Sequence, residues 1–260
     1  MIRYSEYRLA MYLACPRKYY HRYIKEKRTP MAVTPYNILG GNVHLACKEF
    51  YRLNAEARTL DALHADFRSI WKRSSAREFF DSREKEKEFG EEGLRMLANF
   101  HRRFGAVKPY IMEKHMENRF NGFILYGRVD RVDISPSGAL SIIDYKTNRF
   151  KELEGKDRER HTMQLKVYAL LLNSKERPVE TGVYYHLGED CCDTVEFTHE
   201  KIARIHDMIC ELVEEIEHDT VYDPNAGKSC AYCDYHAECD SNSGVAPAED
   251  ANELDLGDGQ

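Results

Sequence analysis

The sequence has no apolar run close to the roughly 20 residues that a membrane-spanning helix needs. Its N-terminal segment turns basic and aromatic directly after "LAMYLAC" and contains no small-residue cleavage site, so no signal peptide is predicted. It also has no internal repeat. These absences argue against a membrane protein and a secreted one, and we expect a cytoplasmic location.

A disulfide framework is not expected, although the chain has eight cysteines. The cytosol keeps thiols reduced, so a set of cysteines there more commonly binds a metal or fills core positions. The 260 residues, of which 42% are hydrophobic and 32% charged, have the composition of a soluble globular protein with one or two domains.

Basic residues are absent from residues 241–260, which hold five acidic residues. This segment is predicted to be an acidic disordered tail, for which a solubilising role is favoured over docking a partner or competing with DNA. Residues 1–28 have the opposite balance, with eight Lys or Arg against two Glu. A basic, tyrosine-rich start suits either a nucleic-acid backbone or a solvated amphipathic helix, and the sequence leaves both open.

Helical spacing of apolar residues dominates the first 104 residues, with a predicted break at Pro16 and a predicted cap at Ser5. The predicted helices cover residues 5–24, 41–55, 60–70 and 94–104. The charge run "SREKEKEFGEEG" at residues 82–93 is typical of a solvated helix face.

Strand patterns begin after Pro109, with tight turns predicted at "NG" and "SPSG". The predicted strands cover residues 110–120, 122–135, 138–147, 179–187 and 193–198. Helical spacing returns at residues 161–174 and again after Thr198, a predicted cap. Helices, three antiparallel strands, a helix, two strands and a final helix together predict an α/β fold with a mixed central sheet flanked by helices.

The stretch "SIIDYKTNR" places Asp144 and Lys146 two positions apart at the end of an apolar strand, so both side chains point to one face. Such a pair alone is more often a surface ion pair. Three further features accompany it. Asp130 lies on the preceding antiparallel strand, where both carboxylates can reach one ion, and His44 is a suitable divalent-metal ligand near the start of a helix. Gln164 and Tyr168 are one helical turn apart.

In this order, the four motifs resemble the PD-(D/E)XK nuclease superfamily, and within it the RecB-like branch with the nuclease domains of RecB and AddB and the CRISPR adaptation nucleases. The motifs are G-x-x-H at 41–44, G-x-x-D at 127–130, D-x-K at 144–146 and Q-x-x-x-Y at 164–168. No proline precedes Asp130, but the Gly-x-x-Asp form is similar to this branch. The resemblance implies a restriction-endonuclease-like core with an N-terminal helical insertion, in a single domain over residues 1–240.

The chemistry of phosphodiester hydrolysis fits these residues. Asp130 and Asp144 supply hard oxygen ligands for Mg²⁺ or Mn²⁺, and Lys146 would position the attacking water. His44 would complete the metal ligands. The resemblance further implies that the backbone carbonyl of Tyr145 faces the metal, and that Gln164 and Tyr168 orient the water, the lysine or the substrate phosphate.

Glu113 stands on the strand before Asp130, where the family often has an acidic residue. It is a candidate for supporting the metal ligands, but a solvent-facing strand glutamate is the favoured interpretation.

Four cysteines form a second set, with Cys15 near the N-terminus and Cys230, Cys233 and Cys239 near the C-terminus. A C-x2-C pair alone more often indicates zinc. One distant cysteine plus C-x2-C-x5-C resembles the iron–sulfur staple of the AddB-type and CRISPR-type nucleases, in which a [4Fe-4S] cluster links the two ends of the domain. Zinc is the second choice.

Two of the remaining four cysteines and three further histidines are predicted to have structural roles. Cys47 and Cys210 fall on apolar helix stripes and are predicted to be core residues. His21, His115 and His186 are expected at the surface or in packing, and His236 could replace one cysteine ligand.

The predicted activity is Mg²⁺- or Mn²⁺-dependent DNA cleavage, exonucleolytic on single-stranded DNA or DNA ends as the branch implies. A partner such as a helicase, repair or CRISPR protein would supply unwinding. One alternative is a catalytically silent nuclease-fold subunit that binds DNA or assembles with partners, but Asp130, Asp144 and Lys146 are all present. The other is a metal-dependent hydrolase with a different substrate, against which the basic N-terminus argues.

Overall fold

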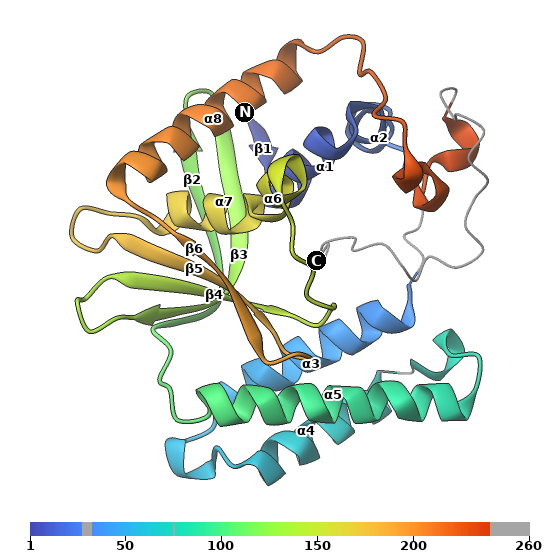
Figure 1. The fold of residues 1–260 in the computed structure, drawn as a ribbon, viewed down its shortest axis with the longest axis vertical. Helices are drawn as coiled ribbons and strands as arrows, with labels where there is room; N and C mark the ends of the chain where they lie inside the picture. The colour runs from blue at the N-terminus through green and yellow to red at the C-terminus, as the bar shows by residue number, and fades with distance from the viewer. Residues whose placement is uncertain (28–32, 75, 240–260) are drawn as a thin grey trace.

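The computed structural model describes residues 1–27, 33–74 and 76–239 (Figure 1). The predicted acidic tail at 241–260 lies outside the described residues. The strands are β1 (Ile2–Tyr4), β2 (Ile111–Phe120), β3 (Phe123–Ile134), β4 (Leu140–Lys146), β5 (Val179–His186) and β6 (Cys191–Glu196). The α-helices are α1 (Glu6–Ala14), α2 (Pro16–Tyr19), α3 (Pro35–Arg52), α4 (Leu60–Arg73), α5 (Arg83–Phe104), α6 (Gly155–His161), α7 (Met163–Leu172) and α8 (His199–His218).

The six strands form one mixed sheet in the order β1-β3-β4-β5-β6, with β2 on the other edge of β3. The pairs β2–β3, β3–β4 and β5–β6 are antiparallel, whereas β1–β3 and β4–β5 are parallel. The mixed sheet flanked by helices confirms the predicted fold class. The short strand β1 was not predicted, because its three residues pair with β3 from more than a hundred positions away and carry no pattern of their own.

Helices cover both faces of the sheet (Figure 1). On one face the core contains side chains of α1, α7 and α8, and on the other it contains those of α3, α4 and α5. The parallel pair β4–β5 requires a crossover between them, and α6 and α7 supply it. Of these two, α6 was not predicted. The functional side chains of β3 and β4 therefore lie between two helical layers.

Local capping fixes where the helices begin. The hydroxyls of Ser5 and Thr198 accept hydrogen bonds from the backbone N–H groups of Arg8 and Lys201, as predicted. Helix α3 begins at Pro35, earlier than expected, because Thr34 caps it and proline suits the first turn. The predicted charge run belongs to the first half of the long helix α5.

The N- and C-terminal parts of the described chain lie side by side (Figure 1). The Arg17 guanidinium donates to the backbone carbonyl of Tyr222 at 3.0 Å, and Lys18 pairs with Asp234 at 3.1 Å. Lys27 pairs with Glu238. Part of the basic N-terminus therefore holds the segment that follows α8, which leaves fewer of its charges for a phosphate backbone. No helix among the described residues is long and apolar enough to span a membrane.

Candidate active site

Three adjacent strands and one helix bring the predicted acidic and basic side chains together. The antiparallel register pairs Arg131 with Ile143, so Asp130 on β3 stands beside Asp144 on β4. Helix α3 packs across this end of the sheet and contributes His44, whose Nδ1 lies 3.3 Å from Asp130 Oδ2. His44, Asp130, Asp144 and Lys146 are each no more than 8% exposed.

A candidate metal centre is formed by His44, Glu113 and Asp130. One ligand atom from each lies within 4.8 Å of the others, from α3, β2 and β3 respectively. An imidazole nitrogen with two carboxylate oxygens is a donor set that suits Mn²⁺, and Mg²⁺ through the carboxylates. Asp144 is not part of this compact group. Its Oδ2 instead lies 3.0 Å from Lys146 Nζ. The residues present therefore fit a divalent ion.

The expectation of a solvent-facing Glu113 was wrong. Its side chain is only 10% exposed and pairs with the Nε of Arg128 at 3.4 Å. Glu113 has φ +45, a conformation that non-glycine residues rarely adopt, and the regular β2–β3 pairing skips it. The register pairs Met112 with Arg131 and Lys114 with Val129, so Glu113 stands opposite Asp130 and both carboxylates lie on one face of the sheet.

The ammonium of Lys146 is held by groups from three elements, β4, α7 and β5. Besides its contact with Asp144, it donates a hydrogen bond to Gln164 Oε1 at 3.0 Å and lies 4.9 Å from the centre of the Tyr184 ring. The face shared by Asp144 and Lys146, predicted from their spacing, is therefore observed. The pair is buried instead of exposed, which removes the surface-ion-pair interpretation.

Gln164 and Tyr168 continue this chain of contacts along one turn of α7. The amide Nε2 of Gln164 donates to the Tyr168 hydroxyl at 3.2 Å, and that hydroxyl donates to the backbone carbonyl of Arg128 at 2.6 Å. Gly127 makes the approach possible, because a Cβ there would lie 2.6 Å from Tyr168 Cε1. The missing side chain at this glycine of the G-x-x-D motif therefore allows α7 to pack closely on β3.

Tyr145 contributes its backbone on the active-site side and its side chain on the other. Its N–H donates to Asp130 Oδ2 at 3.2 Å, while its hydroxyl accepts a hydrogen bond from buried Arg131 at 3.2 Å. The predicted role of its backbone carbonyl as a metal ligand stays a prediction.

The two buried aspartates differ in their affinity for protons. Burial raises the pKa of Asp144 to about 7, with Lys146 opposing the rise and Asp130 adding to it. Burial acts in the same direction on Asp130, but His44, the Tyr145 N–H and Lys146 outweigh it and lower the pKa. Burial and the charge of Asp130 raise the pKa of Glu113. Concentrated negative charge of this kind is relieved by a divalent cation.

Glu6 was not predicted near this site. Its Oε2 is buried without a hydrogen-bond partner among the described residues, and it would lie 3.5 Å from a Cβ at Gly127. Burial raises the pKa of Glu6, partly offset by Lys146 and Arg128. His186 was expected at the surface or in packing, and it is buried beside Lys146 in the β4–β5 register. No spacing rule links the first turn of α1 to β3, so Glu6 could not be predicted at this site from the sequence.

The four predicted cysteines converge on one cavity of about 30 Å³, between α2 and the segment after α8. Backbone N–H groups of Asn225 and Gly227 point to the sulfurs of Cys15 and Cys230, each at 3.4 Å. Among the described residues, no three of these sulfurs lie within 4.8 Å of one another. A tetrahedral zinc ion, with bonds of about 2.3 Å, would bring them to about 4 Å. Four thiols around one cavity are a donor set that suits either a zinc ion or an iron–sulfur cluster.

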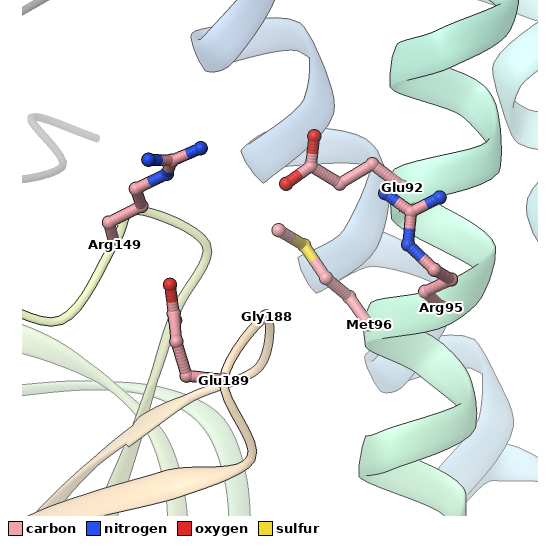
Figure 2. Close-up of a pocket in the computed structure, with 6 residues that line it drawn as sticks. All are labelled: Glu92, Arg95, Met96, Arg149, Gly188 and Glu189. Carbon is pink, nitrogen blue, oxygen red and sulfur yellow. The ribbon is translucent and has the colours of Figure 1, made fainter.

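A hollow of about 260 Å³ lies between α5, the turn between β5 and β6, and the chain that follows β4 (Figure 2). Its lining includes Arg95 and Arg149, but also Glu92 and Glu189. The opposite charges balance, so this hollow lacks the positive excess that a phosphate site needs.

A family model described as the PD-(D/E)XK nuclease superfamily matches residues 3–240. No curated protein matches the chain. A solved structure titled "Crystal structure of SSO0001" is similar over 93% of this chain and 88% of that chain, with 16% identity and a TM-score of 0.44. A likeness this distant supports no conclusion about function.

Proposed function

Because the chain belongs to the PD-(D/E)XK nuclease superfamily, whose members are generally metal-dependent nucleases, we propose that it is a deoxyribonuclease that degrades single-stranded DNA or DNA ends as an exonuclease. The observation that supports this most is the buried donor set of His44, Glu113 and Asp130 within 4.8 Å, next to the held ammonium of Lys146. Mg²⁺ or Mn²⁺ bound there would polarise the scissile phosphate and lower the pKa of the attacking water.

The side chains have separate tasks in this proposal. His44, Asp130 and Asp144, with Glu113 added from the geometry, hold the ion and orient the phosphate. Lys146, fixed by Asp144 and Gln164, positions the attacking water and stabilises charge as it develops. Gln164 and Tyr168 keep the lysine in place through their chain of hydrogen bonds to the β3 backbone.

We further propose that the chain belongs to the RecB-like branch, as a single domain over residues 1–240 stapled by a [4Fe-4S] cluster on Cys15, Cys230, Cys233 and Cys239. The convergence of the cysteines on one cavity supports this. Anaerobically purified protein should be brown, with about four irons per chain, and Cys15→Ser should lose both. One zinc and no colour would contradict the cluster and leave the nuclease site untouched.

The need for a DNA end is tested with two single-stranded DNA substrates of the same sequence, one linear and one circular. With Mn²⁺, the linear form should be degraded and the circular form should persist, and EDTA should stop the reaction. Asp130→Asn should be inactive, whereas Asp207→Asn, an exposed aspartate on α8, should act like wild type. Cleavage of the circular form at an equal rate would overturn the exonuclease assignment.

Two alternatives make different predictions in the same assay. A silent DNA-binding or assembly subunit would bind the linear substrate without cutting it under any metal. A hydrolase with another substrate would show no salt-dependent DNA affinity, because that dependence comes from phosphate contacts. In a DNA repair or CRISPR role, a helicase or another partner in the cytoplasm would supply the unwound strand.

A further inference from the structure

His21 is a buried imidazole, and a buried imidazole normally needs a hydrogen-bond partner. Its side chain is 4% exposed, and neither ring nitrogen has a hydrogen-bond partner among the described residues. Leaving a buried polar group unpaired destabilises a fold, because the group loses its hydrogen bonds to water and gains none. Packing alone does not explain the choice, because a phenylalanine would fill this position without that cost.

The ring of His21 lies at the cavity of the four cysteines. It is part of the cavity wall, together with Cys15, Cys230, Cys233 and Cys239. Tyr235 stacks on it, with the ring centroids 5.3 Å apart and an interplanar angle of 13°. Arg17, Lys18 and His236 also line the cavity.

The backbone around His21 is also unusual. Residues Tyr20–Ile24 form a π-helical turn, closed by a hydrogen bond from the Lys25 N–H to the Tyr20 carbonyl at 2.9 Å. Such turns are rare and occur frequently at functional sites. Burial, helped by Lys25, lowers the pKa of His21, so the ring is neutral at pH 7 and carries one N–H donor.

We propose that His21 donates a hydrogen bond from its ring to a sulfur of the group that the four cysteines hold, and thereby sets the reduction potential of that group. The inference rests on the iron–sulfur cluster proposed above. Hydrogen bonds to cluster sulfurs stabilise the more negative, reduced state. Asn225 and Gly227 already direct backbone N–H groups at two of the cysteines, and His21 adds a donor from the opposite terminus of the chain.

The test is a redox titration of the anaerobically purified full chain, followed by absorption and electron paramagnetic resonance. His21→Phe keeps the stacked ring and removes the donor, so its cluster should become harder to reduce. The oxidised-to-reduced ratio at a fixed potential should rise about tenfold, equal to about 59 mV for one electron. His21→Gln restores an N–H donor and should recover part of the shift. The control Tyr235→Phe keeps the stack and should match wild type.

A second readout is the set of exchangeable protons coupled to the reduced cluster. One of these couplings should be lost in His21→Phe, and all of them should be kept in Tyr235→Phe. If His21→Phe holds no iron, His21→Met provides another non-donor of similar size. Iron retained by His21→Gln but lost from both non-donors would support the hydrogen bond. Loss from all three variants, or a wild-type potential in either non-donor, would overturn it. Iron-free wild-type protein would instead refute the cluster itself, and this inference with it.

Discussion

At the scale of single residues, Glu113 and Glu117 lie on the same strand in opposite surroundings. Glu113 is 10% exposed beside Asp130, whereas Glu117 is 58% exposed and pairs with Arg3. Glu113→Gln should weaken Mn²⁺ binding about 10- to 100-fold, since it removes a carboxylate from the site. Calorimetric titration of the purified variants measures this, and Glu117→Gln is the control. Equal affinities for both variants would contradict the placement of Glu113 at the metal.

Asp144 should make the stability of the metal-free protein depend on pH. Its pKa, about 7 in the folded protein, is near 4 in an unfolded chain. Between these pH values the folded state binds more protons, so stability falls as pH rises. Asp144→Asn cannot ionise, and at pH 8 it should be more stable than wild type by on the order of 2 kcal/mol. Thermal unfolding in EDTA at pH 4 and pH 8 tests this, and an equal difference at both pH values would contradict it.

Spacing in the sequence predicted some residue positions and could not predict others. The i, i+2 and i, i+4 rules placed Asp144 with Lys146 and Gln164 with Tyr168, and the structure has both pairs in contact. Glu113 was missed because a strand glutamate is more often exposed, and only the strand register shows that it stands opposite Asp130. His21 was expected in packing or at the surface, and only the folded arrangement brings it to the cysteine cavity.

At the scale of elements, the packing of α7 on β3 depends on a glycine. A Cβ at Gly127 would lie 2.6 Å from Tyr168 Cε1, so Gly127→Ala should lower the free energy of unfolding by about 1–3 kcal/mol. Urea unfolding measures it. In Gly41→Ala the new Cβ meets nothing within 4 Å, and this helical position should be unaffected or stabilised by about 1 kcal/mol. The cost of Gly127→Ala should shrink when Tyr168 is already alanine; an undiminished cost would show that another contact is responsible.

Helices with a clear apolar stripe were predicted from the sequence, whereas short elements without an apolar pattern were not. The apolar stripe of α8 and its Thr198 cap are both present. Helix α6 has seven mostly charged residues, of which none is buried, so no apolar face marks it. Strand β1 depends on tertiary pairing with β3. The mixed character of the sheet could be predicted because the strand and helix order requires one crossover.

At the scale of the whole molecule, the chain ends are joined by a few ion pairs and aromatic contacts, to which the proposed cluster adds a closure over more than two hundred residues. Cys15→Ser should therefore lower the melting temperature and expose the segment after α8 to protease. Cys210→Ser, a half-buried cysteine on α8 outside the cavity, is the control. A melting temperature for Cys15→Ser equal to that of the control would contradict a structural role for the cysteine set.

The most direct test of the account is the Mn²⁺-dependent cleavage of linear single-stranded DNA by Lys146→Ala beside Lys166→Ala. Both lysines pair with a carboxylate. The partner of Lys166 is Glu159 on α6, which is not part of the proposed site. Lys146→Ala should lose about 10²- to 10³-fold or more in rate while it stays folded, and Lys166→Ala should keep its rate. Cleavage by folded Lys146→Ala at the wild-type rate would contradict the proposed site.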